Sequence, residues 1–497
     1  MVKLCDPVVV RNGTGEGAAL SLDAIGKQDT FLLDKDPEKS LFYYNNVEHT
    51  KFIKKFNYYT LENPNFKTLG IPLQTRFTQL GGTSNVISDV VENCSHMDAL
   101  TWPFNSRVEF TINPKNSGDL LGNMYLKFTI SGEKNPSPWY DFKNKGNQYF
   151  TPNAARSMID NIELMVNGTL VEKLDGKWLH MFDDIYANRE KTIMRETLMN
   201  GGLPGDMFNR VWVDRTTGFD FYMPMDLFFC HTKLEKKTRY LPLAALYNQT
   251  ITIRVQFNNS QYFCANKFFP YTPKLTLVTE EYMVTPQERE YILEHDYSIP
   301  INIIAPHPLV NTDGKTNIQS EIVANNAIKG LHWIFTRKDF IDLNDSDWFG
   351  WLNRPNTQFD YAPYNSMQFY QERLTDNENN DPSMFNATFF INTTEYDNFI
   401  VNSKEAQDSP YPPFYYKYIQ NYQHNLAPPY RNVYTLSFTE NMKTQTPEGI
   451  INIQKVPQGN AFMKIDMKET ATRNYVMFMY YTGFKNLEIK RGMTQVY

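Results

Sequence analysis

Cysteine, long hydrophobic runs and an excess of basic charge are all missing or scarce in this 497-residue sequence. Only four cysteines occur and none has C-x-x-C spacing, so we expect reduced thiols in a cytosolic setting. Without an apolar run near the roughly 20 residues that span a bilayer, the sequence predicts a soluble chain. The formal net charge of -6 argues against a general nucleic-acid binder, and we expect no sequence-specific binding to nucleic acid.

Aromatic and turn-forming residues are what the sequence has in abundance. It contains 35 Phe, 31 Tyr and 28 Pro. This mixture favours many short strands joined by turns over long helices. All-β domains run to roughly 200–250 residues, so two large β domains fit this length as well as three ordinary ones.

Turn and capping signals divide the chain into four parts. We expect an N-terminal arm or inner-face segment at 1–50, a first domain at 51–284, a helix and linker at 285–310, and a second domain at 311–497. Thr285-Pro286-Gln287-Glu288 has the form of a capping box with proline at the first helical position. The prolines of "SIPINIIAPHP" then indicate an extended linker.

The stretch "IELMVNGTLVEKLD" predicts a hairpin, because Asn167-Gly168 is a strong signal for a two-residue type I′ turn. Such a turn gives three cross-strand pairs: Leu164 with Val171, Met165 with Leu170, and Glu163 with Glu172. The last pair sets two carboxylates opposite each other, which is unfavourable unless a cation or a bulge intervenes.

A short amphipathic helix is expected directly after the hairpin. Asp175 can cap it, and its apolar residues recur at i, i+3, i+4 and i+7: Trp178, Met181, Phe182 and Ile185. Asp183-Asp184 is expected to lie on the polar face of this helix.

Further strands are expected in the second domain. The closing ones are "NVYTLSFT", "GIINIQKV", "AFMKIDMK", "YVMFMYYTGF" and "LEIKR". The two halves of the chain have similar lengths, yet no repeat links them residue by residue.

Motifs for chemistry are absent from the sequence. The eight histidines are scattered, with no pair at common metal-site spacing, and no G-x-S-x-G occurs. We therefore expect no catalytic residue, metal ligand or cofactor. A basic and aromatic patch, "HTKFIKKF", is the one candidate site. Its Lys51, Lys54 and Lys55 lie beside phenylalanines and could contact anionic lipid headgroups on an inner face, or nucleic acid. The simpler interpretation is a strand with solvated lysines.

Several segments together resemble a known family. They are "AIGKQDTFLLDKDPEKSLFYYNNVEHTKF", "DLLGNMYLKFTI", "DNIELMVNGTLVEKLDGKWLHMFDDI", "YLPLAALYNQTITIRVQF", "YKYIQNYQHN", "VYTLSFT" and "TPEGIINI". In this order, over residues 24–497, the sequence resembles the major capsid proteins of nucleocytoplasmic large DNA viruses. Residues 190–235 and 340–385 match poorly, and the usual glycine-rich ending is replaced by "NLEIKRGMTQVY".

The resemblance implies an all-β fold of two consecutive eight-stranded antiparallel jelly-roll sandwiches, with a few short helices and long surface loops. It also implies a structural protein without enzymatic activity that forms pseudo-hexagonal homotrimeric capsomers of an icosahedral double-stranded DNA virus. The implied partners are neighbouring capsomers, penton and minor capsid proteins, and in some members an inner membrane. Such a protein is made and assembled in the host cytoplasm and resides in the virion capsid.

Two other functions stay open at this point. The same lineage includes transient scaffold proteins, which share the architecture. A carbohydrate-binding or cupin-like β-sandwich protein would instead need an aromatic groove or clustered histidines brought together by the fold.

Overall fold

The computed structural model describes residues 53–62, 102–130, 154–186, 194–195, 197–199, 219–230, 240–258, 272, 274–324, 327–337, 384–392, 394–397, 415–429, 432–444, 449–457, 459–467, 475–490 and 492–496. The arm expected at 1–50 and Lys51 lie outside these residues. So do three of the four cysteines: Cys5, Cys94 and Cys264.

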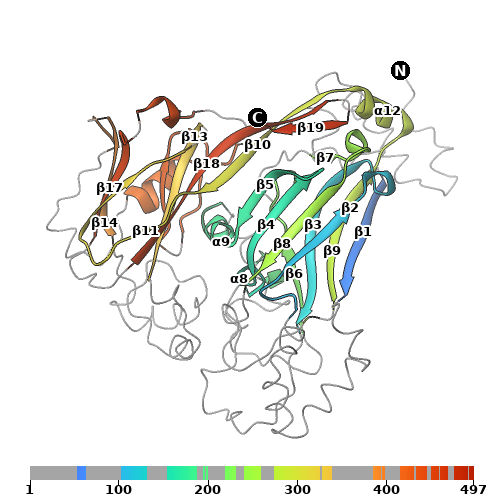
Figure 1. The fold of residues 1–497 in the computed structure, drawn as a ribbon, viewed down its shortest axis with the longest axis horizontal. Coiled ribbons are helices and arrows are strands. Elements are labelled where there is room, and N and C mark those ends of the chain that lie inside the picture. Colours follow the sequence, from blue (N-terminus) through green and yellow to red (C-terminus); the bar gives the residue numbers. More distant parts are fainter. Residues whose placement is uncertain are drawn as a thin grey trace, which may run out of the picture.

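Residues 53–283 form a first β-sandwich of two antiparallel sheets (Figure 1). One sheet has the order β1-β9-β3-β6, with β7 paired to β3, and the other has the order β2-β8-β4-β5. Their strands are β1 (Ile53–Glu62), β2 (Arg107–Ile112), β3 (Leu120–Ile130), β4 (Ile159–Val166), β5 (Thr169–Asp175), β6 (Phe219–Pro224), β7 (Leu241–Pro242), β8 (Ile251–Phe257) and β9 (Lys274–Met283). The helical elements are η3 (Pro114–Asn116), α8 (Ala154–Ser157), α9 (Gly176–Ile185) and η4 (Ala244–Leu246).

Residues 297–496 form a second sandwich of the same kind. One sheet has the order β10-β18-β13-β16, with β11 and β19 paired to β18, and the other has the order β12-β17-β14-β15. Their strands are β10 (Tyr297–Pro306), β11 (Val310–Asn311), β12 (Asn317–Glu321), β13 (Ile328–Arg337), β14 (Met384–Ile391), β15 (Thr394–Asp397), β16 (Tyr434–Ser437), β17 (Ala461–Met467), β18 (Tyr475–Lys490) and β19 (Met493–Val496). The helical elements are η7 (Tyr415–Ile419), α17 (Gln420–Gln423) and η8 (Ile453–Lys455).

The two sandwiches share one strand topology. When the eight main strands of each are numbered in chain order, both pair strands 1-8-3-6 in one sheet, here called sheet A, and strands 2-7-4-5 in the other, here called sheet B. This is the connectivity of a jelly roll, in which two Greek keys fold onto each other. The double jelly roll is therefore confirmed. The two halves of the chain share their strand topology, although their sequences show no repeat residue by residue.

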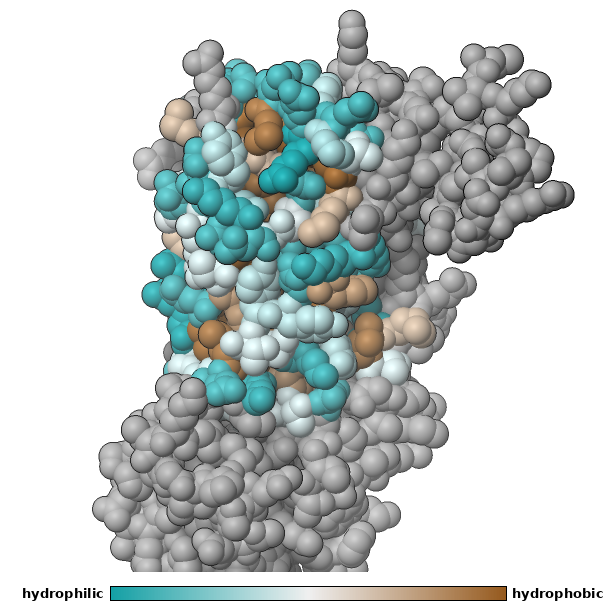
Figure 2. Space-filling model, turned by 90° about the vertical axis from the view of Figure 1, so that its right-hand side faces the viewer, coloured by the Kyte–Doolittle hydropathy of each residue, from teal (hydrophilic) through white to brown (hydrophobic). Residues whose placement is uncertain are grey.

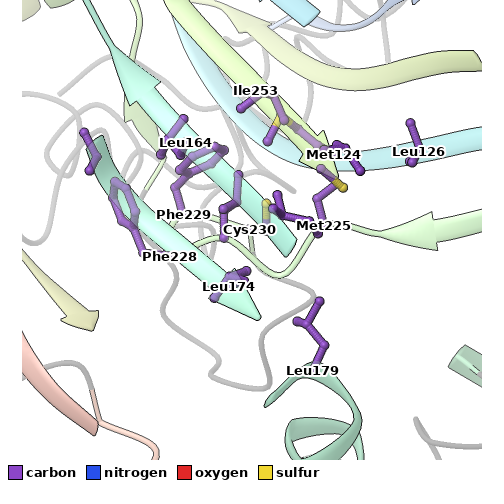
Figure 3. Packing of buried hydrophobic residues seen from close by; sticks show 14 of the residues in the cluster. Met124, Leu126, Leu164, Leu174, Leu179, Met225, Phe228, Phe229, Cys230 and Ile253 are labelled. Carbon is purple, nitrogen blue, oxygen red and sulfur yellow. The ribbon is translucent and has the colours of Figure 1, made fainter. Parts of the chain in front are cut away.

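The core of the first jelly roll lies between its two sheets. Figure 3 shows side chains from both sheets, from α9 and from the segment 225–230 meeting in one cluster. The labelled residues are Met124, Leu126, Leu164, Leu174, Leu179, Met225, Phe228, Phe229, Cys230 and Ile253. Cys230 is buried within this cluster, and its thiol donates to the carbonyl oxygen of Gly122 at 3.8 Å.

The β4–β5 hairpin differs from its expected register at one residue. Asn167 and Gly168 both have positive φ, at 48° and 80°, as a type I′ turn requires. Met165 pairs with Leu170 as expected, but a bulge follows, so Leu164 faces Glu172 and not its expected partner. The bulge also sets Glu163 opposite Lys173, whose Nζ lies 2.9 Å from Glu163 Oε1.

The bulge resolves the clash between carboxylates that a regular register would create. Glu172 is turned into the protein, where it is 3% exposed and its Oε2 accepts a hydrogen bond from the backbone N–H of Phe228 at 2.8 Å. One carboxylate thus gains a cation and the other a buried donor.

A capped helix and an edge strand connect the two jelly rolls. α12 (Pro286–Glu294) begins with the expected capping box, in which Thr285 and Glu288 each bond the backbone of the other. The segment expected to be an extended linker is instead β10, which pairs with β18 along its whole length. Proline is tolerated there because β10 is at the edge of the described sheet, so Pro300 has no second strand to which it must donate.

One expected strand is wrong, because "GIINIQKV" makes only a single bridge, between Ile451 and Ile328, and then turns into η8. Two others, "YVMFMYYTGF" and "LEIKR", are continuous in β18, a strand of 16 residues. Among the described residues, no helix is long and apolar enough to cross a membrane.

The positive φ of Gly168 makes the hairpin testable. A Cβ built at Gly168 meets no atom within 4 Å, so Gly168→Val causes backbone strain without a clash. We expect the variant to lose about 1–2 kcal/mol of unfolding free energy in denaturant titrations. Thr169→Val, at the next position and in extended backbone, is the matched control; equal midpoints for the two variants would refute the turn assignment.

Candidate functional site

The junction between the two jelly rolls is the most elaborate site in the described residues. α9, at the side of the first jelly roll, packs on the outer surface of sheet A of the second (Figure 1). The Trp178 ring lies 5.3 Å from the His332 ring and 5.9 Å from the Tyr480 ring, between centroids. Tyr186, just past the end of α9, stacks edge-on to His332 at 5.7 Å.

Sheet A of the second jelly roll is consequently buried on both faces. Along β18, Phe478 and Tyr480 pack toward the first jelly roll, whereas Met477 and Met479 pack into the core of the second. The same alternation holds along β13. Ile334 packs toward the first jelly roll, whereas Leu331, Trp333 and Phe335 lie in the core of the second. A strand buried on both faces requires a continuous apolar run, which is what "YVMFMYY" supplies.

Asp175 links the start of α9 to the second jelly roll. Its Oδ1 accepts from the backbone N–H of Lys177 at 2.9 Å, as an N-cap should, and also from the hydroxyl of Tyr480 at 2.6 Å. Lys177 then lies with its Nζ 4.1 Å from the centroid of the Phe478 ring, and burial lowers the pKa of this lysine. At the other end of α9, the N–H of Ala427 donates to the carbonyl of Ile185 at 2.7 Å.

His332 is the buried polar group at the centre of the junction. Its Nε2 lies 3.1 Å from the Tyr186 hydroxyl, and its Nδ1 lies 3.0 Å from Thr435 Oγ1. Burial lowers the pKa of His332 to about 3, so the ring is neutral at physiological pH. A neutral imidazole donates through one nitrogen and accepts through the other, which suits two hydroxyl partners.

A buried ionic cluster binds α9 to the rest of the first jelly roll. It joins Arg156 of α8, Asp183 of α9, Arg195, and Asp226 in the segment after β6; none is more than 7% exposed. Arg156 Nε donates to Asp183 Oδ2 at 2.9 Å, and Arg156 also bonds Asp226. Arg195 donates to Asp183 Oδ1 at 2.8 Å and to Asp226 Oδ1 at 3.0 Å.

The charges within this cluster compensate one another. Burial alone would raise the pKa of Asp226, but Arg195 and Arg156 outweigh it and hold the pKa well below its usual range. Burial would likewise lower the pKa of Arg156, and the two carboxylates raise it instead. Removing one member of such a group typically costs about 3–5 kcal/mol, because an uncompensated charge stays buried.

Asp183 therefore does not lie on a polar helix face, as the sequence pattern predicts for Asp183-Asp184. Helical periodicity could not reveal that Arg156, Arg195 and Asp226 come together around it, since these residues are far apart in sequence. The only hint is that Asp226 interrupts an otherwise apolar stretch, "FYMPMDLFFC".

The candidate lysines lie elsewhere, at the start of the edge strand β1. Lys54 Nζ is 2.8 Å from Glu280 Oε1 and 5.1 Å from the centroid of the Phe56 ring. Lys55 is exposed and pairs in register with Glu281. Within the described residues, no group of three or more His, Cys, Asp or Glu side chains is arranged to hold a metal ion.

The first jelly roll matches the model of a known protein family. Residues 83–287 match a family model described as major capsid protein N-terminus, a range that runs through β2 and β9 to the start of α12. Over these residues the sequence matches the major capsid protein family. A major capsid protein is a structural component of a virion and not an enzyme, which agrees with a junction that is a structural contact between the two jelly rolls.

Solved capsid structures share the fold along nearly the whole chain. The quasi-atomic model of the PBCV-1 virus capsid is 15% identical with a TM-score of 0.58, covering 90% of this chain and 97% of that chain. The Faustovirus major capsid protein is 9% identical with a TM-score of 0.54, covering 89% of this chain and 91% of that chain. No curated protein matches the sequence.

The buried neutral histidine predicts a pH dependence of stability. Because its pKa falls from 6.5 to about 3 on folding, the folded chain releases a proton that the unfolded chain holds. This stability is complete above pH 6.5 and is lost as the pH falls from there toward 3; between pH 7 and pH 5 we expect a loss of about 2 kcal/mol. Denaturant titrations at both pH values should show this loss in the wild type and not in His332→Gln; parallel losses would contradict it.

Proposed function

We propose that three copies of this major capsid protein close into a pseudo-hexagonal capsomer that tiles the icosahedral shell of a large double-stranded DNA virus. The observation that carries this proposal is the packing of two topologically equivalent jelly rolls side by side in one chain (Figure 1). Three such chains supply six similar blocks, the number that a hexagonal lattice site needs.

The packed junction supports the proposal because it makes each pair of blocks a rigid unit. The first jelly roll contributes α9 and the second contributes its sheet A, so the contact joins unlike surfaces. A heterologous contact leaves one surface of each type uncovered at the two ends of the pair. Its repetition either closes into a ring or continues as a filament, and three pairs close a ring of six.

The oligomeric state tests this proposal. We expect light scattering to give a stable homotrimer, three times the chain mass of 58.1 kDa, across dilution. Salt should change its stability only modestly, because the contacts bury mainly apolar area. A monodisperse monomer, in protein shown by circular dichroism to be folded, would overturn the proposal.

A permanent shell protein and a transient scaffold protein differ in whether the protein is present in the mature particle. A shell protein persists at high copy number in purified mature particles, together with neighbouring capsomers, penton and minor capsid proteins, whereas a scaffold protein is lost during maturation. Nothing among the described residues favours the carbohydrate-binding or cupin-like alternative over the shell role.

A separate proposal concerns contact of Lys51, Lys54 and Lys55 with anionic lipid headgroups beneath the shell. Lys54 is 40% exposed and its charge is already compensated by Glu280 at 2.8 Å. Lys55 has an exposed side chain. We therefore expect Lys55 to contribute more than Lys54 to attraction by an anionic surface.

Vesicles that contain phosphatidylserine test this contact. Replacing Lys51, Lys54 and Lys55 by Gln should spare the trimer and weaken vesicle binding by up to about 1 kcal/mol per lysine. Among single variants, Lys55→Gln should bind less than Lys54→Gln. Equal binding by the triple variant and the wild type would remove the lipid interpretation.

A further inference from the structure

The two outer surfaces of the first jelly roll differ in chemistry. Sheet A carries exposed aromatic side chains on its outer surface, among them Phe56 and Tyr58 of β1. Figure 2 faces the side of the molecule that lies at the right in Figure 1, and it shows separate hydrophobic patches between hydrophilic residues. The outer surface of sheet B carries mainly charged and polar side chains, because the apolar residues of its strands alternate into the core.

Four charged side chains form one row across the outer surface of sheet B. In register from strand to strand, the row consists of Glu109 on β2, Arg254 on β8, Glu163 on β4 and Lys173 on β5. In Figure 1 these strands follow one another across the first jelly roll in the order β5, β4, β8 and β2. Neighbouring strands lie about 4.8 Å apart, so the row spans roughly 14 Å. The charges in the row alternate in sign from one strand to the next.

Ion pairs and a bulge determine the order of the charges in this row. Arg254 Nε lies 2.7 Å from Glu109 Oε1, and Lys173 Nζ lies 2.9 Å from Glu163 Oε1. The bulge in β5 places Lys173 opposite Glu163, whereas a regular register would place Glu172 there and end the row with two negative charges. The side chains at the two ends are exposed, at 44% for Glu109 and 46% for Lys173. A partner surface therefore meets alternating charges at defined positions.

An alternating row of four charges is complementary to itself when its order is reversed. A two-fold axis parallel to the strands places a second copy of sheet B face to face with the first and reverses the order of its row. Glu109 of each copy then lies opposite Lys173 of the other, and Arg254 lies opposite Glu163. A shift by one strand instead puts like charges opposite each other, which is unfavourable. The row therefore favours one register of such a contact.

The two neighbouring rows on the same surface do not oppose this arrangement. One of them carries no charge, and its residues in register are Thr111, Thr252, Met165 and Leu170. Reversal sets the exposed side chain of Leu170 opposite Thr111, so this row adds apolar area to the contact. The other row begins at Arg107 and ends at Asp175, so that reversal again places opposite charges at its ends.

Among the described residues of the second jelly roll, sheet B has no alternating row. Its residues in register form the rows Gln319–Lys464–Thr388, Asn317–Asp466–Asn386 and Glu321–Phe462–Phe390–Glu395. The first two rows carry one charge each, and reversal of the third would set two glutamates opposite each other. A self-complementary contact therefore belongs to the first jelly roll.

We propose that the outer surface of sheet B in the first jelly roll docks on the same surface of a second copy, which belongs to another capsomer, about a two-fold axis parallel to the strands. This inference rests on the proposed trimer, which supplies the capsomer, and it names a surface through which two capsomers recognise each other. Charge complementarity identifies the occupant, because the reversed row of a second copy matches the first at all four positions.

The row determines the orientation of the contact more than its strength. Its charges are already paired within the chain, and exposed ion pairs contribute only about 0–1 kcal/mol each. Like charges placed opposite each other cost more than matched charges contribute, so the wrong registers are rejected. We therefore expect an association between capsomers that is weak and sensitive to salt, in contrast to the apolar contacts within the trimer.

Charge reversal in separate copies tests the facing pairs. Capsomers of the Glu109→Lys variant would set two lysines opposite each other at both ends of the contact. Capsomers of the Lys173→Glu variant would set two glutamates there. When the two variants are mixed, each end of the contact joins a lysine of one variant to a glutamate of the other, so complementarity returns. Only a two-fold contact between these two positions predicts that each variant associates with the other and not with itself.

Sedimentation velocity at low ionic strength measures the association. Wild-type capsomers should form species larger than one capsomer, and each variant alone should need a roughly tenfold higher concentration to do so. The mixture should associate as the wild type does. Salt at about 1 M, where the Debye length is about 3 Å, should return the wild type to single capsomers without dissociating the trimer. The control Lys490→Glu makes the same charge change as Lys173→Glu at a side chain that is 59% exposed on β18, and it should associate like the wild type.

Folding of the variants is checked separately. Each reversal also puts like charges side by side within its own row, so both variants must show trimers by light scattering at high salt before association is compared. Where a reversed variant does not fold, Glu109→Gln or Lys173→Gln takes its place. The neutral variants should weaken the association to a smaller degree, and unchanged association in both would overturn the contact.

The outcomes separate this inference from the proposed function. Wild-type trimers that never associate further, or variants and a mixture that all associate like the wild type, would overturn the inference and leave the proposed function intact. Weakened association in both variants without recovery in the mixture would overturn the facing pairs. A folded wild-type monomer at every concentration would overturn the proposed function, and with it a contact between capsomers.

Discussion

The burial of one sheet on both of its faces is the constraint on which this structure depends. Sheet A of the second jelly roll forms one wall of its own core and, through Phe478 and Tyr480, the surface on which α9 rests. Neither jelly roll can shift relative to the other without exposing apolar area on both sides of this sheet. Two sandwiches that could have been separate domains are in this way one building block.

Polar groups give the junction its specificity. Asp175 caps α9 and also receives the Tyr480 hydroxyl, so the start of the helix and the neighbouring sheet are set by one carboxylate. His332 satisfies two hydroxyls from different jelly rolls, Tyr186 and Thr435. Apolar area alone would allow several sliding positions, whereas buried hydrogen bonds with defined partners favour one of them.

Local signals in the sequence predicted local structure well. The type I′ turn at Asn167-Gly168, the Asp175 cap and the capping box at Thr285 all form as the residue types require. The sequence predicts the bulge at Val171 only as one way to relieve a carboxylate pair, because the donor that holds Glu172 in place, the N–H of Phe228, is distant in sequence. The ionic cluster around Asp183 and the junction at His332 could not be predicted, since both join residues that only the folded chain brings together. The resemblance to capsid proteins supplied the architecture that periodicity left open.

The pairing of β10 with β18 makes the folding of the first jelly roll depend on residues far along the chain. β18 is the last long strand, and residues near its end, Leu487 and Ile489, complete the core of the first jelly roll together with Tyr297 of β10. After β18, the carbonyl of Gly492 and the hydroxyl of Thr494 bond Gln249, about halfway along the chain. Neither core can therefore close until the ribosome has released residues up to Ile489. Such non-local closure is slow, and it delays the appearance of assembly-competent surfaces until β18 has been synthesised and has paired.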